Sequence, residues 1–400
     1  MQTVVLAAGQ GTRMRPLTAS RPKPMLPVGD RPLVAHTVDT AVDAGASHLV
    51  VVVGYEADDV RSYFGETYRD VPVTFVVQAE QRGTADAVRV ASEALADGPF
   101  VVLNGDALYD TPSLRRLYES GPAVGSYRVE NPSSYGVLIT DGSEEADAVR
   151  VTGVIEKPAE PPSNRINTGA YHFPAEAQSW LEVGESERGE LELTDVLERT
   201  CSEFAVSAVT FERWLDVGRP WELLAATEWK LGDLDGRVEG EVHEDAILEG
   251  PVVVEEGATV RSGVVVEGPA LVRAGATVGP NAYVRGATVV GEGGKVGHGV
   301  EVKNSILMEG ATVGHLSYVG DSVLGRDVNF GAGTKVANLR HDGADVKLTV
   351  KGERVSTGRR KLGVVIGDGV KTGINASLNA GVVLSEGATV GPGEVVTRDK

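Results

Sequence analysis

The sequence predicts two different folds in series, an α/β domain with a mostly parallel sheet followed by a parallel β-helix. Up to about residue 231, β-rich segments alternate with helix-like stretches, which is typical of βαβ units. Beyond residue 240, aliphatic residues recur at every sixth position instead. We therefore expect domains at 1–231 and 241–400, joined by the acidic, glycine-containing linker 232–240.

The first domain is predicted from its strand-like segments and from one helix near its end. The strand predictions are 3–8, 48–53, 73–78 and 100–103, and the helix prediction is 222–231. The first strand runs directly into a glycine-rich turn, where backbone N–H groups can approach phosphate closely. The expected sheet would therefore present a phosphate-sized turn at its edge.

The second domain is predicted from a hexapeptide period. The repeating aliphatic residues are Leu248, Val254, Val260, Val266, Val272, Val278, Val284, Val290, Val296 and Val302. The period slips by one before Leu307, and a second run starts at Ile366. Three hexads make one coil, so these side chains are expected to fill the core of a triangular prism.

The segment 339–362 interrupts the hexapeptide period and is predicted to be a loop that leaves the solenoid. Basic residues gather there: Arg354, Arg359, Arg360 and Lys361. A solvated insertion and a contact with an anionic ligand both remain open for this loop.

Composition excludes several classes of protein. The 400 residues carry a net charge of −19, which disfavours general nucleic-acid binding. No run of about 18 apolar residues predicts a membrane helix, and the N-terminus lacks a signal-peptide pattern, so we expect a cytoplasmic protein. The single cysteine, Cys201, excludes an internal disulfide or a cysteine metal cluster.

An acidic, arginine-rich composition suits concentrated salt, as in a halophilic archaeon, although an ordinary acidic cytosolic protein remains the alternative.

The glycine-rich turn carries an unusual set of cations. Arg13 and Arg15 lie in it, and Lys23 follows between two prolines that restrict its backbone. Met14 stands where a dinucleotide-binding turn needs a third glycine, and the Gly-Lys-Ser/Thr end of a Walker A loop is missing. Three cations beside a phosphate-sized turn instead suit a triphosphate.

This arrangement resembles the signature of the sugar-1-phosphate nucleotidyltransferases, and the resemblance extends along the first half of the chain. The matching segments are 77–85 for the base, 103–106 and 214–218 for two metal-binding aspartates, and 135–136, 156–158 and 167–169 for the sugar. Six segments in the same order make the resemblance specific, whereas a single Asn-Gly-Asp would usually be a turn.

The resemblance implies roles for individual residues. Nucleotide binding falls to Leu6, Ala7, Ala8, Gly9, Gly11, Gln78, Gly83 and Thr84. Sugar-phosphate binding falls to Gly136, Glu156, Lys157 and Asn167. Asp106 and Asp216 would hold Mg²⁺, Arg13 would stabilise the leaving pyrophosphate, and Lys23 would hold the transferred phosphate. These residue types suit a reaction that depends on positioning and charge stabilisation.

Polar residues also interrupt the repeats at a spacing that resembles the acetyltransferase half of the bacterial N-acetylglucosamine-1-phosphate uridyltransferase/glucosamine-1-phosphate acetyltransferases. The resemblance makes His315 the general base, a role for which the unperturbed pKa of histidine is suited. The implied substrate-binding residues are Arg285, Lys303, Tyr318, Asn329, Ala332 and Asn338, with acetyl-CoA as the co-substrate. Leu339 replaces the tyrosine that follows the second asparagine in that family, and the family's basic C-terminal tail for coenzyme A has no counterpart. The Asn-Leu-Arg run at 338–340 is more similar to archaeal bifunctional relatives.

Together the resemblances imply a Rossmann-like α/β nucleotidyltransferase domain followed by a left-handed parallel β-helix of hexapeptide repeats with acetyltransferase activity. The expected substrates are UTP or dTTP, a sugar 1-phosphate derived from glucosamine or galactosamine, and acetyl-CoA, and a homotrimer is implied. One alternative is a thymidylyl- or uridylyltransferase for glucose 1-phosphate whose β-helix is only an assembly scaffold. The other is a non-catalytic subunit of a translation-factor exchange complex, which Arg13, Lys23, Asp106 and Asp216 argue against.

Overall fold

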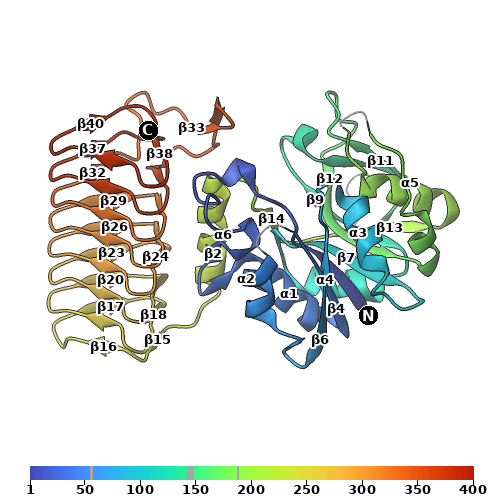
Figure 1. Cartoon of the computed structure of the whole chain (residues 1–400), viewed down its shortest axis with the longest axis horizontal. Helices are drawn as coiled ribbons and strands as arrows, with labels where there is room; N and C mark the ends of the chain where they lie inside the picture. The colour runs from blue at the N-terminus through green and yellow to red at the C-terminus, as the bar shows by residue number, and fades with distance from the viewer. Residues whose placement is uncertain (55–56, 142–147, 187–188) are drawn as a thin grey trace. The chain divides into compact units, whose positions relative to one another are not determined.

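The computed structural model describes residues 1–54, 57–141, 148–186 and 189–400 (Figure 1). The chain forms two compact units. The first contains Met1–Gln10, Pro22–Met25 and Pro32–Asp216, and the second contains Gly11–Arg21, Leu26–Arg31 and Val217–Lys400. Among the described helices, none is both long enough and apolar enough to cross a membrane.

A ten-stranded sheet forms the centre of the first unit, in the order β10-β11-β13-β9-β12-β7-β1-β4-β6-β5. Its strands are β1 (Gln2–Leu6), β4 (His48–Val53), β5 (Thr67–Tyr68), β6 (Val71–Val77), β7 (Phe100–Asn104), β9 (Ala123–Arg128), β10 (Gly136–Asp141), β11 (Ala148–Glu156), β12 (Arg165–Phe173) and β13 (Val206–Thr210). Strands β7, β1, β4 and β6 are adjacent in that order and run parallel to one another, which confirms the α/β prediction.

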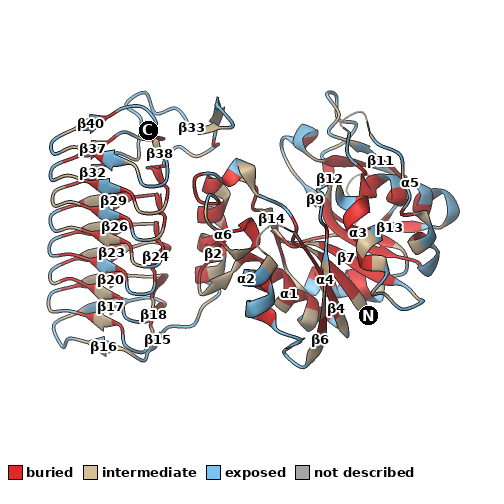
Figure 2. Cartoon of the chain, viewed as in Figure 1, coloured by how far each residue is buried: buried red, intermediate tan, exposed pale blue. Residues whose placement is uncertain are grey.

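Helices cover both faces of this sheet. They are α1 (Leu33–Ala44), α2 (Ala57–Phe64), α3 (Thr84–Ser92), α4 (Thr111–Glu119) and α5 (Leu193–Glu203), with short 3₁₀ turns η2 (Lys23–Met25), η3 (Pro132–Ser134) and η4 (Ala175–Trp180). Residues from α1, α2 and α4 share one core with Val51, whereas residues from α3 and α5 share the other with Val50. Because both faces are buried, β4 is a continuous apolar run rather than an alternating one (Figure 2).

Three eight-stranded parallel sheets in the second unit confirm the predicted left-handed β-helix. The first contains β15 (Arg237–Val238), β18 (Val252–Val254), β21 (Ala270–Val272), β24 (Thr288–Val290), β27 (Ile306–Leu307), β30 (Val323–Leu324), β35 (Val365–Ile366) and β38 (Val383–Leu384). The second contains β16 (Glu241–Val242), β19 (Thr259–Val260), β22 (Thr277–Val278), β25 (Lys295–Val296), β28 (Thr312–Val313), β31 (Asn329–Phe330), β36 (Lys371–Thr372) and β39 (Thr389–Val390). The third contains β17 (Ile247–Glu249), β20 (Val265–Glu267), β23 (Tyr283–Arg285), β26 (Glu301–Lys303), β29 (Tyr318–Gly320), β32 (Lys335–Val336), β37 (Ser377–Leu378) and β40 (Val395–Val396).

The strand register shows how the period slips. Val254 pairs with Val272, which lies 18 residues on and therefore three hexads away. Ile306 pairs with Val323, only 17 residues on. The residues that repeat every six positions form one continuous core, with Val284, Val302 and Leu324 fully buried. A change of coil length must therefore fall in a corner turn, where no core side chain is displaced.

The segment 339–362 leaves the solenoid between two coils. Its hairpin pairs β33 (Lys347–Val350) with β34 (Glu353–Ser356). An isolated bridge between Leu339 and Lys361 closes the neck of the insertion. The coil before the insertion and the coil after it are direct neighbours, because Val323 of β30 pairs with Val365 of β35. The stacking of coils therefore continues without interruption.

Helix α6 (Pro220–Gly232) belongs to the second unit, together with η1 (Thr12–Met14) and the strand β2 (Pro27–Val28), which pairs with β3 (Arg31–Pro32). Leu231 at the end of α6 packs in a cluster with Val253, Leu271 and Val289. The side chains of Val253, Leu271 and Val289 point outward from the first β-helix sheet, whereas their neighbours point into the prism. This explains why both faces of that sheet are apolar.

Truncation of a core side chain should destabilise the β-helix. We expect Leu324→Ala, at a fully buried position, to lower the free energy of unfolding by about 2–5 kcal/mol because it leaves a cavity in the prism. Ile247→Ala is the control, since that side chain is 51% exposed and should change stability by less than about 0.5 kcal/mol. Urea unfolding followed by circular dichroism measures both, and equal effects would contradict this account of the core.

Candidate functional site

In the first unit, the carboxyl ends of the adjacent strands β1 and β7 bring Asp106 and Lys23 together. The Gly105 N–H donates to the Leu6 carbonyl over 2.9 Å, and a Cβ on Gly105 would lie only 2.7 Å from that oxygen. The turn therefore requires glycine. The Lys23 ammonium lies 2.6 Å from Asp106 Oδ2, with the lysine side chain 6% exposed and that of Asp106 35% exposed. A cation and a partly open carboxylate thus meet at the sheet edge.

Asp216 lies beside Asp106 because of a second strand pairing. Strand β14 (Trp214–Asp216) runs antiparallel to β8 (Ala107–Tyr109), and Asp216 pairs with Ala107. Directly opposed residues in such a pair have Cα atoms about 4.5–5.5 Å apart. The two aspartates predicted to bind metal, more than a hundred residues apart in the sequence, therefore lie at one end of a small sheet.

Two aromatic side chains that the sequence analysis did not single out fix the neighbouring segment. Tyr109 Oη donates to the carbonyls of Thr168 and Gly169, both over 3.2 Å, and Trp214 Nε1 donates to the Thr168 carbonyl over 3.0 Å. A Cβ on Gly169 would clash with the Asn104 side chain at 2.1 Å. Tyr109 and Trp214 flank the two aspartates in β8 and β14, so they join the carboxylate pair to the 167–169 segment.

Gln78 is buried and its amide is held in a fixed direction. Nε2 donates to the Gly83 carbonyl over 3.1 Å and to Asp86 over 2.9 Å. Burial acts to raise the pKa of Asp86, but the hydrogen bonds from Gln78 and Arg89 outweigh it, and this pKa lies below its usual value. With both amide hydrogens engaged, Gln78 presents its carbonyl oxygen to an N–H donor.

The other residues expected to bind nucleotide fall in both compact units. Leu6, Ala7, Ala8 and Gly9 follow the end of β1 in the first unit, where Ala7 N–H donates to the Val52 carbonyl. Thr84 has a structural contact, since its hydroxyl accepts from the Leu193 N–H over 3.0 Å at the start of α5. Gly11 and the exposed Arg13 belong to the second unit, in the turn that begins η1.

The predicted sugar-phosphate residues gather where β10, β11 and β12 meet. Gly136 pairs with Glu156, and a Cβ on Gly136 would lie 2.8 Å from Glu156 Oε2 and 3.7 Å from the Asn167 Cβ. The Asn167 amide donates to Tyr171 Oη over 2.6 Å, and its carbonyl accepts from the Gly169 N–H. Lys157 has a left-handed backbone and lies 3.4 Å from Glu156, a half-exposed ion pair that contributes little stability.

In the second unit, a buried carboxylate joins two of the predicted acetyltransferase residues. The Asp321 side chain is only 3% exposed and lies 3.0 Å from the Lys303 ammonium. It also accepts hydrogen bonds from Asn304 over 3.0 Å and from Asn338 over 2.5 Å. Asp321 therefore sets the positions of Lys303 and Asn338 at once, although we did not assign it a role from the sequence.

A spacing signal in the sequence marks this position. Core residues Val302 and Leu307, and again Val319 and Leu324, are five residues apart rather than six. Both shortened turns contain a residue with a positive φ, Asn304 at 45° and Asp321 at 49°. The missing residue in each corner brings these two side chains within hydrogen-bond distance.

Tyr318 and Arg285 complete this face of the third β-helix sheet. The Asn338 amide donates to Tyr318 Oη over 3.2 Å, and a Cβ on Gly320 would lie 2.5 Å from that oxygen. Burial, followed by the charges of Glu301 and Asp321, raises the pKa of Tyr318, so its hydroxyl is protonated and can donate. Arg285, in register with Lys303, lies 2.7 Å from Glu301.

The remaining residues expected to serve acetyl transfer, His315, Asn329 and Ala332, lie in the second β-helix sheet and at the corner that follows it. His315 is exposed in the turn between β28 and β29, and its carbonyl accepts from the Gly333 N–H in the next coil, beside Ala332. Asn329 is exposed in β31. Within the described part of the chain, the His315 imidazole makes no hydrogen bond to another residue. The turn from His315 leads into β29, which begins at Tyr318.

A groove runs over the third sheet from the Tyr318 side chain. It has a volume of about 700 Å³, and Tyr318, Lys335, Asn338 and Ser377 are among its lining residues. This Tyr318 groove offers amide, hydroxyl, ammonium and imidazole groups to a ligand, the imidazole from His341, beside aliphatic side chains.

Protein-family models match both halves of the chain. Residues 2–231 match the nucleotidyl transferase family model, and residues 266–386 match the model of the GMPPB C-terminal domain. Among solved structures, UDP-glucose pyrophosphorylase complexed with UDP-glucose is similar, with a TM-score of 0.54 and 24% identity over 58% of this chain and 99% of that one. At that identity the likeness shows the fold alone.

Curated relatives match over the full length. The chain is 38% identical to the bifunctional sugar-1-phosphate nucleotidylyltransferase/acetyltransferase of Sulfurisphaera tokodaii, over all of this chain and 98% of that protein. It is also 38% identical to the bifunctional protein GlmU of Methanocaldococcus jannaschii, over all of this chain and 95% of that one. A uridylyltransferase for glucose 1-phosphate, AglF of Haloferax volcanii, is 38% identical over 55% of this chain and 92% of its own length. The chain therefore belongs to the family of bifunctional sugar-1-phosphate nucleotidylyltransferase/acetyltransferases.

Proposed function

We propose that the protein acetylates glucosamine 1-phosphate from acetyl-CoA and then joins N-acetylglucosamine 1-phosphate to UTP, giving UDP-N-acetylglucosamine and pyrophosphate. The observation that carries the proposal is the presence of two separate polar sites in one chain. One has Lys23 against Asp106, and the other has Asp321 bound to Lys303 and Asn338. Galactosamine 1-phosphate is a second acceptor of the same chemistry.

In nucleotidyl transfer, a phosphate oxygen of the sugar phosphate attacks the α-phosphorus of the nucleotide, and the bond to the β-phosphate breaks. The nucleophile is already ionised, so the chain has to position it and stabilise charge. Lys23 would hold the phosphate undergoing transfer, and Arg13 would stabilise the leaving pyrophosphate. The Gln78 carbonyl suits the ring N–H that uracil and thymine share, and the uridylyltransferase named among the relatives supports UTP.

The carboxylate pair fits a magnesium ion. Asp106 and Asp216 offer hard oxygen donors at one end of the β8–β14 sheet, and Mg²⁺ typically takes one or two carboxylates plus phosphate oxygens. When bound, the ion would neutralise charge on the phosphates. Glu156 and Asn167, which both lie close to Gly136, would orient the sugar hydroxyls, and Lys157 would bind the sugar phosphate.

In acetyl transfer, the amine nitrogen of the sugar attacks the thioester carbonyl, the carbon–sulfur bond breaks, and coenzyme A leaves as a thiol. His315 would take the proton that the amine loses, because its ordinary pKa is near neutrality. Arg285 and Lys303 would hold the sugar phosphate. Asn329, Asn338 and the Ala332 backbone would supply fixed dipoles around the thioester.

We further propose a homotrimer in the cytoplasm, with residues 1–231 carrying nucleotidyl transfer and residues 241–400 carrying acetyl transfer. His315 is exposed, and Leu316 beside it and Ile374 are 55% and 57% exposed. Exposed aliphatic groups near a catalytic histidine favour a subunit seam at this corner. The nucleotide and acetyl-CoA are intracellular substrates, which supports the location.

Removal of the proposed base should abolish acetyl transfer. In high salt, we expect the wild type to release thiol from acetyl-CoA with glucosamine 1-phosphate, and His315→Ala to lose at least about 100-fold in kcat, the usual scale for a general base. His298→Ala, at another turn of the same β-helix, is the matched control. Absence of thiol release by a wild type that still makes nucleotide sugars would leave the β-helix as a scaffold.

Loss of a metal-binding carboxylate should affect only the other reaction. We expect Asp106→Asn to lower pyrophosphate release by at least about 100-fold, since it removes a charge from the Mg²⁺ site while keeping an oxygen near Lys23. Acetylation by the same sample should be unchanged. A chelator should reproduce this pattern, and inhibition of acetylation by either treatment would contradict the separation of the two sites.

Asp321 should act as a positioning residue. We expect Asp321→Asn to lower kcat/KM for acetyl transfer by about 10- to 100-fold. This is the fold-change that corresponds to the free energy of one or two hydrogen bonds to a charged group. The KM for the amino-sugar phosphate should carry most of the change, because Lys303 loses its partner. Asp327→Asn is the control, since Asp327 also has a positive φ, 53°, in a β-helix turn. A loss of thermal stability with kinetics unchanged would mean that Asp321 is only structural.

A further inference from the structure

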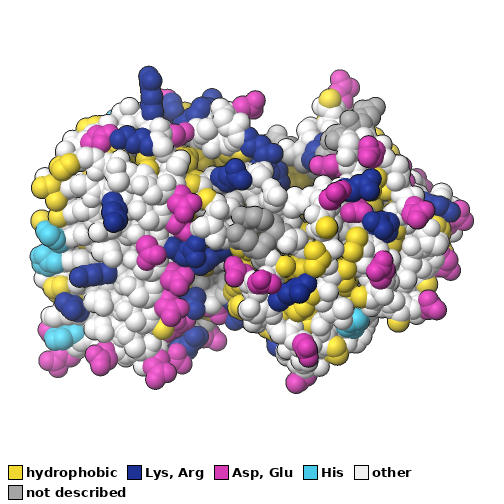
Figure 3. Space-filling view, in the orientation of Figure 1, with side chains coloured by type: hydrophobic (Ala, Val, Ile, Leu, Met, Phe, Trp, Pro, Cys, Tyr) yellow, Lys and Arg dark blue, Asp and Glu magenta, His cyan; other side chains and the backbone are white. Residues whose placement is uncertain are grey.

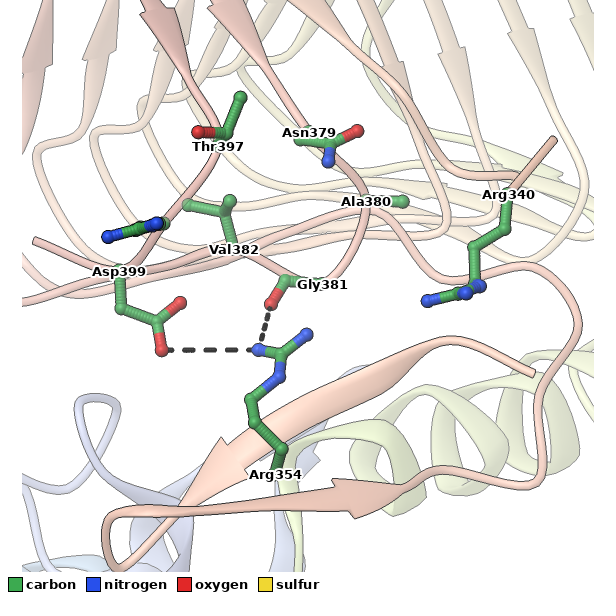
Figure 4. A pocket seen from close by; sticks show the side chains of 9 residues that line it. Arg340, Arg354, Asn379, Ala380, Gly381, Val382, Thr397 and Asp399 are labelled. Atoms are coloured by element: carbon green, nitrogen blue, oxygen red, sulfur yellow. Dashed lines mark hydrogen bonds and ion pairs between the residues drawn. The ribbon is translucent and has the colours of Figure 1, made fainter. Parts of the chain in front are cut away.

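A small pocket rich in arginine lies where the inserted segment 339–362 meets the last two coils of the β-helix. It has a volume of about 310 Å³, and Arg340, Arg354 and Arg398 line it together with one acidic residue, Asp399 (Figure 4). We call it the arginine pocket. Three guanidinium groups around one small space are unusual in a chain whose net charge is −19.

The positive charge of the pocket is only partly compensated. The Arg354 guanidinium donates to the Gly381 carbonyl over 3.0 Å and lies 4.0 Å from Asp399, as Figure 4 shows. Arg340 is paired with Asp342 at 2.5 Å. Arg398 is exposed and has no hydrogen bond or ion pair within the described ranges. Asp342 and Asp399 compensate the charges of Arg340 and Arg354, so the charge of Arg398 remains to attract an anion.

Charge is distributed unevenly along the β-helix as well. Basic side chains gather toward the end that carries β33 and the C-terminus, whereas acidic side chains gather at the opposite end (Figure 3). The first coils, 237–260, contain seven acidic residues and one arginine. An approaching anion is therefore steered toward the end that contains the arginine pocket.

The arginine pocket continues the Tyr318 groove. Asn379 and Thr397 line both spaces. Along the third sheet, Thr397 follows β40, which lies three strands beyond β29 with its Tyr318. Adjacent strands are about 4.8 Å apart, so this separation is about 14 Å. On the other side of β29, strands β26 and β23 carry Lys303 and Arg285.

Two groups of cations thus lie on opposite sides of Tyr318 and Asn338. The transfer of an acetyl group from acetyl-CoA to a sugar phosphate brings together two substrates that both carry phosphate, at a distance from the reacting atoms. The acceptor is short, so its phosphate must lie near the reacting amine. The donor has a long flexible arm between its thioester and its phosphorylated nucleotide, so its phosphates suit the more distant cations.

We propose that the arginine pocket binds the phosphates of the acyl-CoA donor, an inference that rests on the acetyltransferase activity proposed above. Arginine is suited to this because its planar fork of donors matches phosphate oxygens in pairs. Arg398 supplies the uncompensated charge, and Arg354 anchors the hairpin to the last coils through the Gly381 carbonyl. The inserted segment then has a function, since it contributes Arg340 and Arg354 to the pocket.

Charge reversal at Arg398 tests the proposal. With full-length protein, we expect Arg398→Glu to raise the KM for acetyl-CoA at least about tenfold, the lower end for a lost charge-assisted hydrogen bond, with the KM for glucosamine 1-phosphate within about twofold of wild type. Arg261→Glu makes the same charge change at an exposed turn of an early coil and should leave both values unchanged. A rise confined to the sugar phosphate would assign the pocket to the acceptor and overturn the proposal, as would no change in either KM.

A truncated donor separates phosphate recognition from other effects. S-Acetylpantetheine retains the thioester arm and lacks the nucleotide with its phosphates, so wild type and Arg398→Glu should use it equally well. A variant that remains worse than wild type with this donor would contradict the proposal.

Calorimetric titration with coenzyme A measures binding without acetyl transfer, so it tests the arginine pocket independently of the proposed activity. If the wild type transfers no acetyl group, the proposed activity fails. Weaker binding of coenzyme A by Arg398→Glu than by Arg261→Glu would still support the pocket, and equal binding by the two variants would overturn it.

Discussion

The stacking register of the β-helix is the constraint on which the second site depends. Every coil must place its aliphatic side chains above those of the coil before, so extra or missing residues are confined to the corners. Two shortened corners bring Asn304 to Asp321, and the long insertion leaves from the corner after Asn338, where the Leu339–Lys361 bridge closes its neck. Lys303, Asp321 and Asn338 therefore lie where the repeat departs from its period, while the repeat itself supplies rigidity.

Close backbone approach has the corresponding role in the first unit. Gly105 lies against the Leu6 carbonyl, and Gly169 lies against the Asn104 side chain. No residue with a Cβ fits at either place, so these glycines bring the ends of β1, β7 and β12 together. Tyr109 and Trp214 then hydrogen-bond the 168–169 backbone, and the buried Lys23 compensates Asp106. A site of separate short segments is in this way held by a few buried polar contacts, which are strong because water is excluded from them.

Much of the fold was predictable because its signals are periodic. The hexapeptide spacing predicted the β-helix core down to Val254 and Val302, and β-rich segments alternating with helices predicted the parallel sheet. In the first half, the order of short motifs predicted which residues gather, such as Asp106 with Lys23. Tyr109 and Asp321 were missed because their contacts are made with residues distant in sequence. The hydroxyl of Thr84, a residue expected to bind nucleotide, accepts a hydrogen bond at the start of α5, a contact that crosses more than a hundred residues and that no local pattern indicates.

The sequence by itself determined the two architectures, the family and most of the polar residues of both sites, because these follow from local periodicity and from residue types at short spacings. Only the tertiary structure decided how those residues are divided and oriented. It left His315 and Asn329 outside the lining of the Tyr318 groove, made Asp321 the common partner of Lys303 and Asn338, and combined Arg354 of the insertion with Arg398 of the last coil in one pocket. Such groupings depend on which coils and strand ends become neighbours in space, and that is set by stacking and by insertion length rather than by any local pattern.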